Sequence, residues 1–241
     1  MSAPFDEDSA DFLDRLGVAV FKIPSGEITN LPFLAHVAQK GKPLIISTGM
    51  SYLQEVEAAV ETLKKNKNKN FALLHCVSQY PTNPQDVNLK AMDTLAKAFH
   101  VPVGFSDHTM GIEISLAAVA RGAQIIEKHF TLDRNLKGPD HKASLEPSEL
   151  KTLVRGIRNI EVALGNGCKK PSFKEKEIAI MARKSLVATQ DIPVGTLLLE
   201  KLITAKRPGT GLSPSMKSSI VGKKTKVFIP KDHLIHLDML I

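Results

Sequence analysis

The sequence predicts an α/β protein: a TIM (β/α)8-type barrel that lacks its first two βα units, followed by a small C-terminal β domain. Three observations predict this architecture. Short apolar runs alternate with segments of helical periodicity through the first two thirds of the 241 residues. Each of these runs ends in polar residues. After residue 165 the pattern changes to short β-like pieces separated by glycine and proline.

Five apolar runs rich in valine, isoleucine and leucine have the length of buried strands. They span residues 19–25, 43–49, 71–78, 101–107 and 124–131. Segments with apolar residues at i, i+3, i+4 and i+7 predict helices at 52–65, 89–99, 112–121 and 149–164. Strands that are almost wholly apolar and alternate with helices indicate a parallel sheet covered on both faces.

The ends of the runs favour a barrel over a doubly wound sheet. A doubly wound fold gathers its ligand contacts at one switch point, whereas a barrel uses the C-terminal ends of nearly all its strands. All five runs end in segments that contain polar or charged residues, namely KIPSGE at 22–27, STG at 47–49, HCVS at 75–78, SDH at 106–108 and EKH at 127–129. The sequence therefore predicts a barrel mouth to which every run contributes.

The number of units is smaller than a barrel requires. Residues 2–6 are interpreted as the polar end of one further strand, and a helix is expected at 9–16. Two more units at the same spacing would add roughly 50–60 residues and bring the barrel near its usual size of about 250 residues. An open six-stranded sheet would leave two unpaired edges, so we expect a barrel without its first two units.

The last third of the chain is expected to form a separate domain. A partial barrel at 1–165 is followed by a charged linker at 166–180, which contains Pro171, and by a small β domain at 181–241. Short β-like pieces are expected at 185–188, 196–199, 204–206 and 226–229, with glycine- and proline-rich turns between them.

Composition argues against several classes of protein. No apolar run reaches the roughly 18–20 residues that a membrane-spanning helix needs, and the N-terminus has no signal-peptide pattern. Cys76 and Cys168 are too few for a disulfide framework, which predicts a reducing, cytoplasmic location. We therefore expect neither a membrane partner nor a secreted protein.

The net charge of +7 is confined to the C-terminal third. Residues 1–165 carry 18 basic and 19 acidic side chains, whereas residues 166–241 carry 14 basic and 6 acidic ones. With no tryptophan and only Tyr52 and Tyr80, aromatic platforms for stacking bases are scarce. We therefore expect no nucleic-acid partner, and a solvated lysine-rich surface is one alternative explanation of the charge.

With these motifs in view, the sequence resembles the N-acetylneuraminate (sialic acid) synthase family, which includes the legionaminic and pseudaminic acid synthases. The motifs that carry the resemblance are FKIPSGEITN at 21–30, ISTGM at 46–50, LHC at 74–76, GFSDHT at 104–109, EKHFT at 127–131 and GPDHKASLEP at 138–147. In the C-terminal third, ARKSL at 182–186 and KRPGTG at 206–211 resemble the antifreeze-like (SAF) domain of the family, a β-clip. The PSGE form at 24–27 is more similar to sialic and legionaminic acid synthases than to pseudaminic acid synthases.

The resemblance implies a condensation of phosphoenolpyruvate (PEP) with N-acetylmannosamine or a related N-acyl hexosamine, giving a nine-carbon α-keto acid and phosphate. A lysine and several hydroxyls at strand ends suit a phosphate dianion. The residues concerned are Lys22, Ser25, Ser47, Ser78 and Ser106, of which all but Ser78 match PEP-binding positions of the family. Any single serine could equally end a strand or cap a helix.

Two histidines are the candidate metal ligands. His108 and His129 follow consecutive strands, so their imidazoles are expected to approach each other at the barrel mouth. Both match metal ligands of the family, which implies Mn²⁺, with Mg²⁺ or Co²⁺ as alternatives, acting as a Lewis acid. His75, one strand earlier, is interpreted as a packing or outer-sphere residue.

The resemblance also implies residues for the sugar. Glu27 and Asp140 are the candidate catalytic carboxylates, able to bind sugar hydroxyls or move protons, and Tyr80 and Arg207 are candidate sugar-binding residues. In the family, the C-terminal domain of one subunit caps the barrel of its partner and supplies the arginine. The expected assembly is therefore a homodimer.

Two other functions stay open. Ala3 stands where the family has a threonine, and together with the two missing units this suggests a catalytically impaired remnant or an interaction subunit. Binding of nucleic acid through the basic C-terminal third would predict a steep dependence of affinity on salt.

Overall fold

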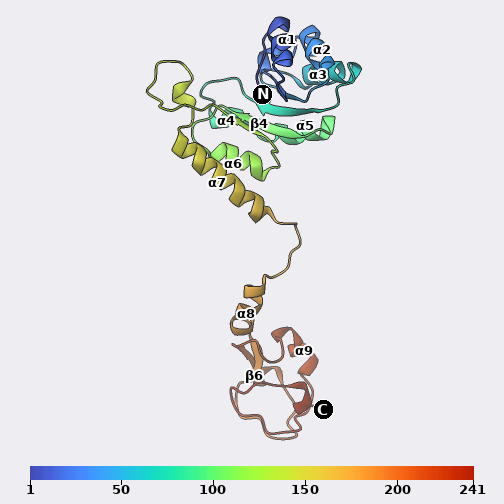
Figure 1. Cartoon of the computed structure of the whole chain (residues 1–241). Helices are drawn as coiled ribbons and strands as arrows, with labels where there is room; N and C mark the ends of the chain where they lie inside the picture. The colour runs from blue at the N-terminus through green and yellow to red at the C-terminus, as the bar shows by residue number, and fades with distance from the viewer. The chain divides into compact units, whose positions relative to one another are not determined.

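A computed structural model describes all 241 residues, which divide into two compact units, Met1–Gly167 and Cys168–Ile241. Figure 1 shows the two units along the chain. Each unit has a hydrophobic core of its own.

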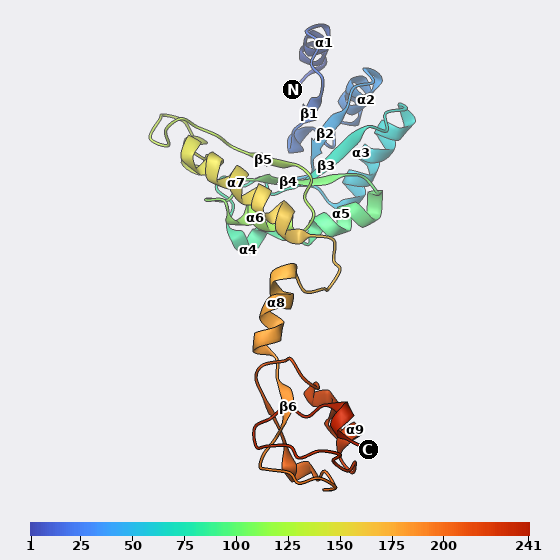
Figure 2. The same ribbon diagram turned by 60° about the horizontal axis from the view of Figure 1, so that its bottom comes forward.

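The first unit is built on a parallel sheet in which the strands follow one another in sequence order. The strands are β1 (Phe21–Ile23), β2 (Leu44–Ser47), β3 (Phe71–Cys76), β4 (Val103–Asp107) and β5 (Ile126–Lys128). All five predicted strands are present, each shorter than its apolar run. The sheet curls, with helices along its outer side (Figure 2), so the predicted α/β, TIM-like architecture is confirmed.

Helices connect the strands and supply the outer layer of the core. They are α1 (Glu7–Arg15), α2 (Leu31–Gln39), α3 (Leu53–Lys65), α4 (Pro84–Val87), α5 (Ala91–Phe99), α6 (Glu113–Ala120) and α7 (Pro147–Leu164), with short 3-10 turns at Ser25–Glu27 and His141–Ala143. In α3 the buried residues are Val56, Ala59, Val60 and Leu63, which recur on one face of the helix. This apolar stripe is why the segment folds as a helix against the sheet.

The expected strand at residues 2–6 is reduced to a single bridge. Ser2 pairs with Phe21 in parallel fashion, and the Ser2 carbonyl accepts a hydrogen bond of 2.9 Å from the Lys22 amide. Asp6 then caps α1 by accepting a bond of 2.7 Å from the Ser9 amide. The segment pairs with β1 at its N-terminal end, but one bridge is too short to count as a strand.

Gly104 marks the tightest packing between β4 and its neighbours. A methyl group added at this position would collide with the carbonyl oxygen of Ile125 and lie 2.6 Å from Cδ2 of Leu74. We expect Gly104→Ala to lower the free energy of unfolding by about 1–3 kcal/mol, because a backbone atom cannot move aside cheaply. Chemical denaturation measures this effect. Gly26→Ala, which places its methyl group in open space, is the control and should differ little from the wild type.

The second unit contains a two-stranded antiparallel sheet of β6 (Ser185–Ala188) and β7 (Ile203–Lys206). Its other elements are α8 (Phe173–Ala182), α9 (Lys217–Ile220) and 3-10 turns at Glu200–Leu202, Pro214–Met216 and Leu237–Met239. The predictions at 185–188 and 204–206 are confirmed. Those at 196–199 and 226–229 are wrong as strands, since these segments make only isolated bridges.

The segment expected to be a linker contains helix α8. Ser172 accepts a hydrogen bond from the Glu175 amide, and the Glu175 carboxylate accepts one of 2.8 Å from the Ser172 amide. This reciprocal capping box starts the helix shortly after Pro171. No helix of the protein combines the length and the apolar character that crossing a membrane requires.

Candidate active site

Lys22 lies at the centre of the polar groups that the sheet brings together. Its side chain is buried, with the residue only 8% exposed, and Nζ donates hydrogen bonds to Ser47 Oγ at 2.8 Å and to the Ile23 carbonyl at 3.0 Å. Nζ also lies 3.6 Å from Glu127 Oε1. Burial lowers the pKa of this ammonium group, and the nearby Glu127 carboxylate opposes that shift.

The contact between Lys22 and Glu127 joins the two edges of the sheet. Lys22 is on β1 and Glu127 on β5, with three strands between them. Neighbouring strands lie about 4.8 Å apart, so in a flat sheet these residues would be roughly 19 Å from each other. The sheet therefore curls until its first and last strands face each other across a concave surface.

Ser25 and Ser78 converge on the backbone at Gly49. The Gly49 amide donates to Ser25 Oγ at 3.0 Å. A methyl group added at Gly49 would collide with Ser78 Oγ and lie 2.8 Å from Ser25 Oγ. A larger residue at position 49 would therefore displace the two serine hydroxyls, which approach the chain closely here.

Ser106 and Glu127 form a cross-strand pair on the same concave surface. They are register partners in the β4–β5 ladder, and Ser106 Oγ donates to Glu127 Oε1 at 2.7 Å. Lys22, Ser47 and Ser106 thus belong to connected contacts at the C-terminal ends of β1, β2 and β4, while Ser25 and Ser78 lie beside Gly49. Glu127 has no predicted role, although its position two residues before His129 places both side chains on one face of the strand.

His108 and His129 follow the ends of β4 and β5, as expected, and their rings meet. The ring centroids are 5.2 Å apart in a T-shaped arrangement. Tyr80, from the loop after β3, lies against both rings, with its centroid 4.1 Å from that of His108 and 5.3 Å from that of His129. The structure therefore joins a predicted sugar-binding residue to the two predicted metal ligands.

The donor set of the two histidines fits a divalent cation. His108 Nδ1 is 2.7 Å from the Val77 carbonyl, which only accepts, so Nδ1 carries a proton, and in the neutral ring Nε2 keeps a lone pair for a metal. Burial and the neighbouring His108 lower the pKa of His129, which favours its neutral, ligating form. Burial lowers the pKa of His108, but hydrogen bonds to Cys76 and Val77 have a larger effect and raise it.

The two histidines would be the protein's contribution to a metal site. No cluster of three or more histidine, cysteine or acidic side chains is present, so further ligands would have to come from water or substrate.

The two predicted carboxylates, Asp140 and Glu27, and the predicted arginine, Arg207, lie in three different parts of the structure. Asp140 Oδ2 is 3.9 Å from His129 Nδ1, which puts it beside the histidine pair. Glu27 lies in the 3-10 turn after β1 and accepts a hydrogen bond of 2.9 Å from Asn30. Arg207 is exposed in the second unit, where its Nε donates to the Ala182 carbonyl at 3.0 Å.

Cys76 lies among the candidate site residues, which sequence reasoning did not anticipate. Its Sγ is 3.9 Å from His108 Nδ1, and it also interacts with Ser25 and Ser106. Burial raises the pKa of the thiol, but these hydrogen bonds outweigh the effect and lower it. The preceding residue, His75, makes a bond of 2.6 Å to the Val87 carbonyl.

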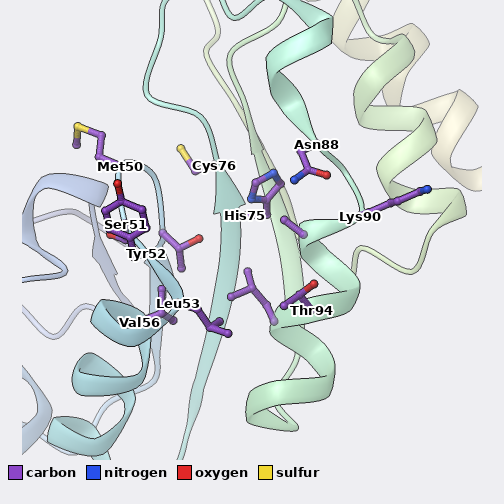
Figure 3. Close-up of a pocket in the computed structure, with 13 residues that line it drawn as sticks. Met50, Ser51, Tyr52, Leu53, Val56, His75, Cys76, Asn88, Lys90 and Thr94 are labelled. Atoms are coloured by element: carbon purple, nitrogen blue, oxygen red, sulfur yellow. The ribbon is translucent and has the colours of Figure 1, made fainter.

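A separate cavity of about 680 Å³ lies between α3 and α5, over the end of β3 (Figure 3). Its walls include Leu53 and Val56 of α3, Thr94 of α5, and both His75 and Cys76. None of the eleven residues predicted for the site lines this cavity. The candidate active site is therefore defined by contacts on the concave surface and not by this cavity.

Comparison with known proteins identifies two families along the chain. Residues 1–169 match the NeuB family, and residues 183–241 match the SAF domain. The first match covers the unit that holds the polar cluster, and the second covers most of the small unit that holds Arg207.

Named relatives and a solved structure agree with these matches. The chain is 52% identical over 237 residues to an N,N'-diacetyllegionaminic acid synthase of Campylobacter jejuni, covering 98% of this chain and 71% of that one. It is 42% identical over 232 residues to an N-acetylneuraminate-9-phosphate synthase of Homo sapiens, covering 95% of this chain and 64% of that one. The crystal structure of an N-acetylneuraminic acid synthetase from Leptospira borgpetersenii is similar with a TM-score of 0.69 and 45% identity, covering 73% of this chain and 61% of that one.

Proposed function

The chain belongs to the NeuB family of synthases, and from this premise we propose that it condenses PEP with an N-acyl hexosamine to give a nine-carbon α-keto sugar acid and phosphate. One observation carries the proposal: the buried Lys22 ammonium, with Ser47 and Ser106, shares a concave surface with the His108–His129 pair. An anion site and a pair of metal-type donors are the two features that this reaction needs side by side.

PEP is proposed to bind at the ends of β1 to β4. Lys22 supplies a desolvated positive charge for the phosphate or the carboxylate, and a charge of this kind gains most from an anionic partner where water is excluded. The hydroxyls of Ser25, Ser47, Ser78 and Ser106 supply neutral hydrogen-bond donors around it. Glu127, which accepts from Ser106 and lies near Lys22, holds these two donors in place before PEP arrives.

The two imidazoles are proposed to hold a divalent cation, Mn²⁺ in the first instance, with Mg²⁺ or Co²⁺ as alternatives. Such an ion would polarise the aldehyde of the sugar as a Lewis acid. His108 is fixed for this role by its bond to the Val77 carbonyl. Tyr80 lies against both rings.

The remaining residues are proposed to position the sugar and move protons. A bond forms between C3 of PEP and the aldehyde carbon, water adds at C2, and phosphate leaves when the C2–O bond breaks. Asp140, beside His129, is placed to exchange a proton with the aldehyde oxygen or the incoming water. Glu27 and Tyr80 are proposed to contact sugar hydroxyls.

Arg207 is proposed to bind the N-acyl group of the sugar from a second copy of the chain. The excess of basic side chains in residues 166–241, 14 against 6 acidic ones, supports a role of this unit beside an anionic substrate. Sedimentation velocity tests the assembly, with a homodimer as the expected result and a monomer at all concentrations as the contrary one.

Phosphate release tests the proposed reaction. We expect phosphate to appear only when PEP, an N-acyl hexosamine and Mn²⁺ are all present, and chelation of the metal should stop it. A sugar with one acetamido group should be compared with a sugar that has two, since the Campylobacter relative is named for an N,N'-diacetyl product.

The other outcomes of this assay separate the alternatives. Phosphate release without any sugar would indicate a phosphatase and contradict the proposal. PEP binding without phosphate release under any condition would favour the catalytically impaired interaction subunit.

A further inference from the structure

The β4–β5 ladder ends in two polar cross-strand pairs, which the two histidines follow. Ser106 opposes Glu127, Asp107 opposes Lys128, and His108 and His129 come directly after the last paired residues. Because side chains alternate between the two faces of a sheet, the Ser106–Glu127 pair and the two histidines lie on the concave surface, and the middle pair, Asp107 and Lys128, lies on the other face. Asp107 and Lys128 are therefore next to the histidines in the chain but are turned away from them.

The middle pair is a buried ion pair. Lys128 Nζ lies 3.0 Å from Asp107 Oδ2, and the two side chains are 3% and 0% exposed. A buried charge pair persists only when its remaining hydrogen-bonding capacity is also satisfied. Here Lys128 Nζ donates a second bond, of 2.6 Å, to the Thr109 carbonyl.

The Asp107 carboxylate links three more groups to this point. Oδ1 accepts from the Thr109 amide at 2.8 Å and from Thr109 Oγ1 at 2.7 Å. Oδ2 accepts from Ser115 Oγ of α6 at 2.5 Å. Strand β4, strand β5, helix α6 and the residue after His108 are thus joined by one buried network.

The position of this network matters because regular pairing stops there. No ladder pair follows Asp107 and Lys128, and β5 is a three-residue strand at the edge of the sheet. Backbone pairing between β4 and β5 therefore does not reach the two histidines. The carbonyl of each histidine is held by a different segment: that of His108 accepts from the Thr82 amide at 2.9 Å, and that of His129 accepts from the Leu145 amide at 2.9 Å.

We propose that Asp107 and Lys128 are positioning residues that set the separation of the His108 and His129 imidazoles. The ion pair holds the ends of β4 and β5 in register one residue before the histidines, and so it fixes the two ring nitrogens for a shared ligand. The inference deepens the proposed function, since it concerns the same histidine pair, but the geometry of the rings can be measured without turnover.

The test uses the double variant Asp107→Asn/Lys128→Met in the full chain. Removing both charges avoids leaving one of them buried and unpaired, so the thermal midpoint should stay close to that of the wild type. NMR spectra of the histidine ring protons should nevertheless show altered chemical shifts for His108 and His129. Each ring changes the chemical shifts of the other's protons through its ring current, because the two rings are T-shaped with centroids 5.2 Å apart. Mn²⁺ affinity, followed by electron paramagnetic resonance without substrate, should fall about 10- to 100-fold, the usual effect of losing a supporting residue.

Leu63→Ala is the matched control. Leu63 is a fully buried residue of α3, so this variant should lose stability while the histidine shifts stay unchanged. Unchanged shifts together with unchanged Mn²⁺ affinity in the double variant would overturn the proposal. If the native chain binds no Mn²⁺, the metal part of the proposed function fails, and the NMR comparison alone still decides the positioning role.

Discussion

Replacing Lys22 with methionine is expected to weaken PEP binding about 100-fold while leaving the protein at least as stable as the wild type. The ammonium group belongs to a residue that is 8% exposed, and it faces two neutral oxygen atoms and one carboxylate oxygen 3.6 Å away. An anionic ligand would add hydrogen bonds in which donor and acceptor are both charged, and hydrogen bonds to charged groups are worth roughly 1.5–3 kcal/mol each. Methionine fills the same space without a charge and cannot make them.

The stability part of this prediction follows from the lowered pKa of Lys22. Burial makes the pKa lower in the folded chain than in the unfolded chain. The unfolded chain therefore binds more protons between those two values, and stability rises with pH across that window. Below it, protonated Lys22 costs folding free energy, and Lys22→Met removes that cost.

Isothermal titration with PEP and differential scanning calorimetry measure the two effects separately. Lys65→Met is the control, because Lys65 is an exposed lysine in a surface pair with Glu61 and should affect neither quantity. Native PEP affinity in the Lys22→Met variant would show that the phosphate does not bind at the end of β1.

Loss of either histidine is expected to lower metal-dependent phosphate release by at least about 100-fold, more than the loss of a supporting residue would. His108→Asn can keep the bond to the Val77 carbonyl through its amide while removing the Nε2 lone pair. The double variant His108→Asn/His129→Asn should be no worse than either single one, because ligands of one ion act as a unit.

The control for this series is His36→Asn. His36 lies on α2 and pairs with Asp11 at 2.7 Å, away from the concave surface. Phosphate release as a function of Mn²⁺ concentration measures the effect. A single variant that keeps native turnover at every Mn²⁺ concentration would remove that histidine from the proposed machinery.

The strands of the first unit were predictable because each is a short apolar run that ends in polar residues. The parallel order of these strands is enough to predict that Lys22, Ser47 and Ser106 share one edge of the sheet. The role of Glu127 was missed although the alternation of side chains along β5 places it beside His129. The contact between Lys22 and Glu127 could not be predicted, since it depends on how far the sheet curls.

The second unit was less predictable for physical reasons. Isolated bridges at Leu197 and Ile229 depend on contacts between distant segments, and local composition does not encode them. Helix α8 lies in a segment that Pro171 and the surrounding charges mark as a linker. The Ser172–Glu175 capping box is the local feature that predicts the helix. The contact of Tyr80 with both histidine rings arises from the path of the loop after β3, which no periodicity describes.

A crystal structure of the chain with PEP and Mn²⁺, recorded at the manganese absorption edge, would show whether both ligands bind on the concave surface. We expect PEP oxygen atoms within hydrogen-bonding distance of Lys22 Nζ and of the Ser47 and Ser106 hydroxyls, with an anomalous peak beside His108 and His129. PEP in the cavity between α3 and α5, or manganese bound away from both histidines, would contradict it.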